Sequence, residues 1–310
     1  MLNRRDLLKI SAVLTTGAFI PAPVKAAVKA KNGTFRYCLN TSTISGQHPG
    51  LLRAIEIAST AGYDGMELWV SDIRKYLEQG NTIQSLAAFL TSKNIVVENA
   101  ISFTAWMVDD EAQRAAALAE LEEEMKLVAV LGCHRIAAPP AGVSKDQPIN
   151  FQQAGARFKE ILELGRKYNV MPLLEFWGAS GTLYNLSQAM AIAAAADDRE
   201  ARILPDVYHL FRGGSGFEAL SLLNGKVIDI IHLNDYPASN PVYEQTDADR
   251  VYPGDGVAPL KQVLRDLKNM GGTKVLSLEL FNKTYWTQDA LVVAKTGLQK
   301  MKSLVNSLDA

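Results

Sequence analysis

Four acidic or histidine residues lie at the C-terminal ends of four short apolar runs in the second half of the chain: Glu175, Asp206, His232 and Glu279. Runs of this length that are rich in Val, Ile and Leu are typical of buried strands, where ionisable side chains rarely lie without a partner. Three carboxylates and an imidazole that meet at one rim would form a site for a divalent cation. For any one of them taken alone, a structural ion pair is the alternative.

The strands that carry these residues belong to a regular alternation along the chain. Apolar runs predict eight strands, each followed by a segment with the periodicity of a helix. The strands are expected at residues 35–43, 65–70, 95–103, 134–139, 171–177, 202–208, 227–234 and 274–281. This order favours a single-domain (β/α)8 TIM barrel over residues 27–310. An open doubly wound sheet is the competitor, but the turn after the first strand contains no GxGxxG.

Residues 1–26 have the pattern of an export signal rather than of a folded element. Arg4 and Arg5 precede an apolar stretch, and small residues suited to cleavage end at Ala26. This pattern is similar to a twin-arginine signal, and a generic secretory signal is the alternative. Both predict a periplasmic or otherwise exported protein.

Composition excludes several classes of protein. The net charge of −1 lacks the basic excess that nucleic-acid binding needs, and no segment after the signal is long and apolar enough to span a membrane. Of the two cysteines, Cys38 and Cys133, each lies in or near an expected strand and is interpreted as a small buried hydrophobic residue. A disulfide between them is the alternative.

Aromatic and acidic residues add to the expected site. Trp69, Trp106, Trp177 and Trp286 lie at or just after expected strands, at the rim where barrels carry their active sites. Because aromatic faces pack against the C–H faces of sugars, they predict a carbohydrate pocket, although tryptophans also fill space between loops and helices. Asp235, three residues after His232, is expected to orient a ligand from outside the coordination shell.

The chain resembles the xylose-isomerase-like superfamily of sugar isomerases and epimerases. The resemblance rests on the order of the four residues on strands five to eight, on His209 after strand six, and on Ala61–Trp69, which reads AGYDGMELW. Within this superfamily, the chain is similar to the branch that contains ketose 3-epimerases, hydroxypyruvate isomerases and inosose dehydratases. By this resemblance Glu175, Asp206, His232 and Glu279 bind the cation, and His209 and Arg250 contact substrate oxygens. An insertion between Asp235 and Arg250 departs from the family pattern.

These groups predict a metal-dependent sugar isomerase or epimerase. Mn²⁺ or Mg²⁺ suits this donor set best, and Zn²⁺ or Co²⁺ also fits it. Glu175 and Glu279 would move a proton at carbon through an enediolate, on an unphosphorylated sugar or sugar derivative. Elimination from a keto-sugar or keto-glycoside and a non-catalytic carbohydrate-binding barrel are the alternatives. A DNA-repair endonuclease shares the fold but needs more metal ligands and a basic face. The relatives further suggest a homodimer or homotetramer.

Overall fold

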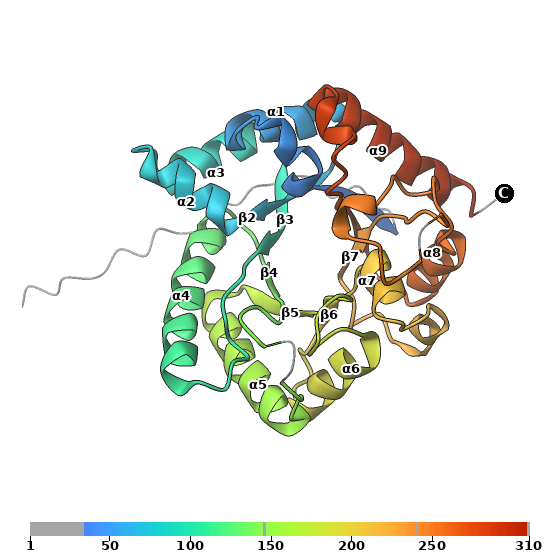
Figure 1. Ribbon diagram of the computed structural model, residues 1–310. Helices are drawn as coiled ribbons and strands as arrows, with labels where there is room; N and C mark the ends of the chain where they lie inside the picture. Colours follow the sequence, from blue (N-terminus) through green and yellow to red (C-terminus); the bar gives the residue numbers. More distant parts are fainter. Residues whose placement is uncertain (1–33, 145–146, 240, 309–310) are drawn as a thin grey trace, which may run out of the picture.

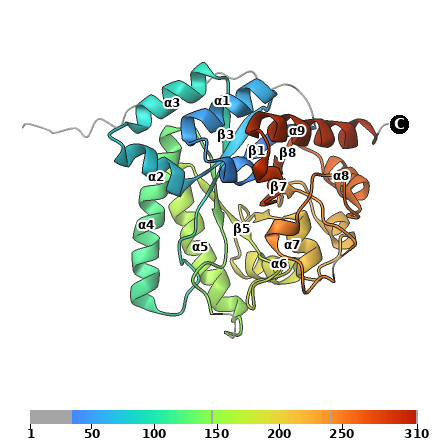
Figure 2. The ribbon, with the colours of Figure 1, turned by 45° about the horizontal axis from the view of Figure 1, so that its top comes forward.

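A computed structural model describes residues 34–144, 147–239 and 241–308, so the predicted export signal lies outside the described residues. The chain forms a ring of helices around a barrel of parallel strands, as Figure 1 shows along the barrel axis. Helices α1 (Leu51–Ala61) and α9 (Ala290–Asn306), from the two ends of this region, lie side by side and complete the ring (Figures 1 and 2).

The described strands follow one another around the barrel in sequence order, which confirms the predicted (β/α)8 architecture. They are β1 (Phe35–Asn40), β2 (Gly65–Trp69), β3 (Val96–Ile101), β4 (Arg135–Ala138), β5 (Met171–Glu175), β6 (Ile203–Leu204), β7 (Ile230–Leu233) and β8 (Lys274–Leu278). Between β6 and β7 the barrel is joined by a single parallel bridge that pairs Asp206 with His232. The His232 N–H donates to the Pro205 carbonyl at 3.0 Å beside it.

The remaining helices are α2 (Val70–Glu78), α3 (Ile83–Ser92), α4 (Glu111–Val130), α5 (Phe151–Tyr168), α6 (Leu186–Ala195), α7 (Val207–Arg212) and α8 (Leu260–Asn269). Short 3₁₀ turns span Thr41–Gln47, Glu218–Leu222, Asp247–Asp249 and Tyr285–Thr287.

Most expected strands are shorter in the structure, and three local differences affect the site or its surroundings. The first strand ends at Asn40, whose side chain accepts from the Ser42 N–H and starts a 3₁₀ turn where more strand was expected. Helix α2 begins directly after β2 and was not expected. Strand β6 has two residues, because Asp206 caps α7 by accepting from the His209 N–H at 2.9 Å. At Asn40 and at Asp206, a side-chain hydrogen bond to the backbone ends the strand before the apolar pattern does.

Alternation along the strands separates two buried layers. The barrel interior contains small and branched apolar side chains, among them Cys38, Leu173, Ile230 and Val275. Two or more residues further along the same strands, the inward side chains become polar, with Asn40, Glu175, His232 and Ser277. The inside of the barrel is therefore apolar at one end and ionisable at the other.

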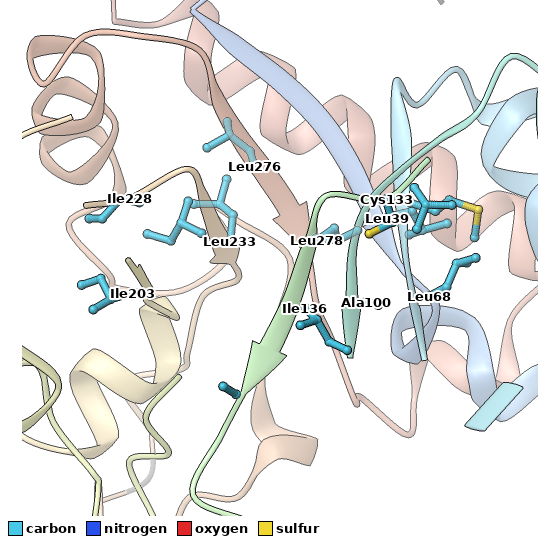
Figure 3. Packing of buried hydrophobic residues seen from close by; sticks show 14 of the residues in the cluster. Leu39, Leu68, Ala100, Cys133, Ile136, Ile203, Ile228, Leu233, Leu276 and Leu278 are labelled. Carbon is cyan, nitrogen blue, oxygen red and sulfur yellow. The ribbon is translucent and has the colours of Figure 1, made fainter. Parts of the chain in front are cut away.

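The outward side chains of the strands pack against the helices in one continuous core. Leu39, Leu276 and Leu278 lie in it with Ile136 and Cys133, and Figure 3 shows part of this packing. Both described cysteines are buried and free, as predicted for small hydrophobic residues. In the described part of the chain, no helix is both long and apolar enough to cross a bilayer.

The end of the barrel opposite the polar layer is closed by an ion cluster. Glu98 lies 2.6 Å from an Arg36 guanidinium nitrogen and 3.3 Å from one of Arg135. Arg135 and Arg202 also pair with Asp229, at 3.7 and 3.0 Å. Glu98 thus lies in the cluster at the N-terminal end, where barrels carry stability rather than chemistry.

We predict that Glu98→Gln lowers the free energy of unfolding by about 2–3 kcal/mol, because two partly buried guanidinium groups lose their carboxylate. Glu120→Gln is the matched control, since the exposed pair of Glu120 with Arg74 should contribute less than about 1 kcal/mol. Urea unfolding of both variants measures the difference. Equal losses would contradict a structural role for the cluster.

Candidate metal centre

The structure brings the four residues from strands five to eight together around one imidazole nitrogen. His232 Nδ1 lies 3.0 Å from Glu279 Oε2, 3.5 Å from Asp206 Oδ2 and 3.8 Å from Glu175 Oε1. Glu175 ends β5, Asp206 follows β6, His232 lies in β7 and Glu279 follows β8, so the C-terminal ends of adjacent strands place them. All four are buried.

This arrangement fits a divalent cation. One ligand atom from each of Asp206, His232 and Glu279 lies within 4.8 Å of the others. His232 Nδ1 is buried and makes no hydrogen bond to the described residues, while Nε2 lies 3.1 Å from Glu67 Oε1. When a cation replaces the proton on Nδ1, the Glu67 carboxylate keeps the proton on Nε2 and the Nδ1 lone pair is directed at the cluster, as in metal-binding histidines. Carboxylates with one imidazole suit Mn²⁺, Mg²⁺, Zn²⁺ or Co²⁺.

Glu67 supports the centre from below, a role that sequence reasoning missed. The sequence alone favours a half-buried ion pair for this residue, but its carboxylate is fully buried beneath His232. It accepts hydrogen bonds from Asn99 at 2.8 Å, from Asn40 at 3.1 Å and from Ser277. Strand alternation could have identified it, because Glu67 and Trp69 share one face of β2.

Burial and neighbouring charges shift the pKa values of these groups in different directions. Burial, together with Glu279 and Asp206, raises the pKa of Glu175 to about 8. Burial alone would raise the pKa of Asp206, but Arg250 and His209 outweigh it and hold that pKa below its usual range. Burial opposes protonation of His232, yet Glu279 and Glu67 raise its pKa well above the ordinary value. Glu175 is therefore the carboxyl that can hold a proton near neutral pH.

Arg250 lies inside the site rather than on the surface. Its Nη1 donates to Asp206 Oδ2 and to Glu279 Oε2, both at 2.8 Å, and its Nη2 lies 3.2 Å from His209 Nε2. The Gly178 N–H lies 3.2 Å from His209 Nδ1, and because a neutral imidazole has one lone pair, the ring accepts a hydrogen bond from either Gly178 or Arg250. Asp247, on the inserted loop, accepts from Arg250 Nη2. The guanidinium thus balances the carboxylates and lines the cavity above them.

The structure contradicts the expected contact between Asp235 and a cation ligand. The Asp235 carboxylate instead accepts from the N–H groups of Gly254, Gly256 and Ala258, at 3.0, 3.1 and 2.9 Å. A Cβ on Gly256 would lie 2.2 Å from the Tyr236 carbonyl oxygen, so this close approach requires glycine. The backbone of Asp235 also pairs with Val251. Asp235 therefore organises the loop that carries Arg250.

A cavity of about 430 Å³ opens above the ligand cluster. Glu175, His209, Arg250 and Glu279 line it on the polar side, and the apolar side includes two of the four expected tryptophans, Trp69 and Trp177, with Phe103 and Phe281. The phenylalanines were missed because only tryptophans were considered. The Trp69 ring meets Phe103 and Phe281 edge-on, with centroids 5.1 and 6.3 Å away.

The other two tryptophans lie elsewhere, which corrects the expectation that they contact substrate. Trp106 is 1% exposed, donates its indole N–H to the Pro139 carbonyl and packs against Phe158 in the core. Trp286 donates to the Ser42 carbonyl and packs against Gly46, outside the lining of the cavity. Both fill space between loops and helices, the alternative that the sequence left open.

Residues 55–304 match the family model described as a xylose isomerase-like TIM barrel. The chain belongs to this family. Among its relatives is the inosose isomerase of Bacillus velezensis, 27% identical over 87% of this chain and 97% of the relative. A 3-dehydroshikimate dehydratase of Pseudomonas aeruginosa is 24% identical over 84% of this chain and 40% of the longer relative. A solved structure of the IolI protein with a zinc atom superposes with a TM-score of 0.80 at 24% identity, over 88% and 99% of the two chains.

We predict that Asp235→Ala loosens the loop after β7, because three backbone N–H groups lose their acceptor, at a cost of about 1–3 kcal/mol. Urea unfolding measures the cost, and limited proteolysis should cut residues 236–256 faster than in the wild type. Asp255→Ala, which removes an exposed ion pair with Lys300, is the control and should change stability by less than about 1 kcal/mol. An Asp235 variant as protease-resistant as this control would contradict the assignment.

Proposed function

We propose that the protein is a divalent-metal-dependent isomerase or epimerase that acts on an unphosphorylated sugar or sugar derivative through an enediolate. The observation that carries this proposal is the buried Asp206, His232 and Glu279 cluster with Glu175 beside it, at the base of a cavity with an aromatic wall. The inosose isomerase relatives support a cyclic polyhydroxylated ketone as the substrate class.

Asp206, His232, Glu279 and Glu175 would hold the cation. A divalent ion there supplies Lewis-acid polarisation of a carbonyl and its neighbouring hydroxyl, which makes the C–H between them more acidic. The His209 imidazole and the Arg250 guanidinium line the same cavity and would contact substrate oxygens, to which the guanidinium would donate hydrogen bonds. They would favour the negative charge that develops when the proton leaves.

Glu175 and Glu279 are the proposed proton carriers. They come from β5 and from the end of β8, on different sides of the cavity, so they could serve the two faces of one carbon. Removal from one face and return on the other gives epimerisation, whereas return to the neighbouring carbon gives isomerisation. The raised pKa of Glu175, about 8, lies close to the range in which a carboxyl both takes and gives a proton.

The aromatic wall supports a sugar-like substrate. Trp69 and Trp177 line the cavity together with the polar groups, and aromatic rings of this kind pack against sugar C–H faces. The preference for an unphosphorylated substrate rests on the predicted twin-arginine export to the periplasm and on the absence of a Gly-rich phosphate loop in the sequence. A homodimer or homotetramer stays a prediction from the family.

Elimination at the same site is the second candidate. The 3-dehydroshikimate dehydratase relative catalyses loss of water, according to its name. Elimination needs the same proton removal beside a carbonyl, followed by departure of a group on the next carbon. A keto-sugar or keto-glycoside would supply such a group. A barrel that binds carbohydrate without catalysis would show neither reaction.

A deuterium experiment tests the proposal. We predict that the Mn²⁺-reconstituted protein, in D₂O with a panel of free ketoses, inososes and 3-keto-glycosides, incorporates deuterium at carbon into at least one compound. Incorporation without loss of water or alcohol indicates epimerisation or isomerisation, and release of either indicates elimination. Wild-type protein treated with a chelator is the control. Binding without exchange or release across the panel would support the non-catalytic barrel.

Two variants should separate metal binding from proton transfer. We predict that Asp206→Asn weakens metal affinity by about 10–100-fold, because a charge leaves the cation's surroundings. Glu175→Gln should retain more affinity and lose turnover by about 10²–10⁴-fold at saturating metal, because an amide cannot accept the substrate proton. Isothermal titration with Mn²⁺ and steady-state kinetics measure the two effects. Near-normal turnover of Glu175→Gln would transfer the role of base to Glu279.

A further inference from the structure

Asn40 occupies a central place in the polar layer at the C-terminal end of the barrel. It is fully buried at the end of β1, between β2 and β8. Its side-chain Nδ2 donates to Glu279 Oε1 at 3.0 Å and to Glu67 Oε2 at 3.1 Å. The Asn40 amide therefore contacts one proposed cation ligand, Glu279, directly. It also contacts Glu67, which in turn contacts a second proposed ligand, His232.

The orientation of this amide is determined by its neighbours. On the oxygen side, the Trp69 indole N–H and the Ser42 backbone N–H both donate to Oδ1 at 3.0 Å. On the nitrogen side stand two carboxylates, which accept only. Donors on one side and acceptors on the other leave a single arrangement, so the amide is held before any ligand or substrate binds.

The contact with Asn40 gives the two carboxylate oxygens of Glu279 different partners. Oε1 accepts from Asn40, whereas Oε2 faces Asp206 and His232, with His232 Nδ1 3.0 Å away. Without the Asn40 N–H, the carboxylate could rotate about its last torsion, which is broad for glutamate. Arg250 contacts Oε2, the same oxygen that faces the cluster, and so does not replace the contact to Oε1.

We infer that Asn40 is a positioning residue of the metal centre: its amide holds Glu279 with one oxygen turned toward Asp206 and His232 and keeps the other occupied. The inference rests on the proposed function, because it assigns the supporting contact of a proposed cation ligand. Asn40 itself contacts neither cation nor substrate.

Asn99 provides a matched control for Asn40. It is also fully buried, and its Nδ2 donates to Glu67 Oε1 at 2.8 Å, but no hydrogen bond in the described structure links it to a proposed ligand. Loss of either amide removes one hydrogen bond from Glu67. Only loss of Asn40 frees Glu279.

The experiment titrates the full-length protein with Co²⁺ and records the visible absorption band, which reports coordination number and geometry. N40A and N40D are expected to bind Co²⁺ about 10–100-fold more weakly than the wild type and to show an altered band, as loss of a supporting contact to a metal ligand predicts. N99A should lose unfolding free energy yet keep the wild-type band, with affinity within about threefold.

N40D keeps an oxygen for the Trp69 and Ser42 N–H groups, so it decides the question if N40A does not fold. A wild-type band and affinity in the Asn40 variants would overturn the inference while leaving the metal centre standing. An altered band in N40A beside a wild-type N40D would also overturn it, because the acceptor side of the amide would then matter. A wild-type protein that binds no Co²⁺ would overturn the proposed function itself.

Discussion

The concentration of negative charge at one end of the barrel is the constraint on which the rest of the structure depends. Glu67, Glu175, Asp206 and Glu279 are all buried within reach of one imidazole. Buried carboxylates are stable only with compensating charge or hydrogen bonds. Arg250 and His232 supply compensating charge, and the buried asparagines supply hydrogen bonds. The loop after β7 carries Arg250 and places its guanidinium inside the site.

The same constraint explains why chemistry and stability occupy opposite ends of the barrel. At the N-terminal end, Glu98 meets two arginines, whose charges compensate its carboxylate. At the C-terminal end, compensation is incomplete, and burial raises the pKa of Glu175 to about 8. A site with surplus negative charge is one that a cation or a proton can enter, whereas the N-terminal cluster, with three arginines and two carboxylates, has no such surplus.

The barrel and the four residues at the C-terminal ends of its strands could be predicted from the sequence. The alternation of apolar runs gave the barrel, and an ionisable residue at the end of a buried run is conspicuous, so Glu175, Asp206, His232 and Glu279 were found together. Glu67 was missed because it lies within its strand, where the pattern cannot distinguish a ligand's partner from an ion pair. Trp106 was misplaced because strand position does not set the direction of a side chain in the following loop. Asp235 lies close to His232 in sequence, but its carboxylate turns to backbone amides that only the folded loop brings near.

The bridge between Asp206 and His232 links the site to the scaffold, because two proposed cation ligands also join the least regular pair of strands in the barrel. In most enzymes of this architecture a lineage can lose catalysis by replacing site residues while the scaffold persists. Here the bridge itself is a backbone contact, but the Asp206 carboxylate also accepts from Asn234 at 3.1 Å, so replacement of Asp206 would loosen the seam between β6 and β7. Descendants that abandon the chemistry would be expected to keep Asp206, so its presence alone is a poor guide to activity when paralogues of this chain are sorted by sequence.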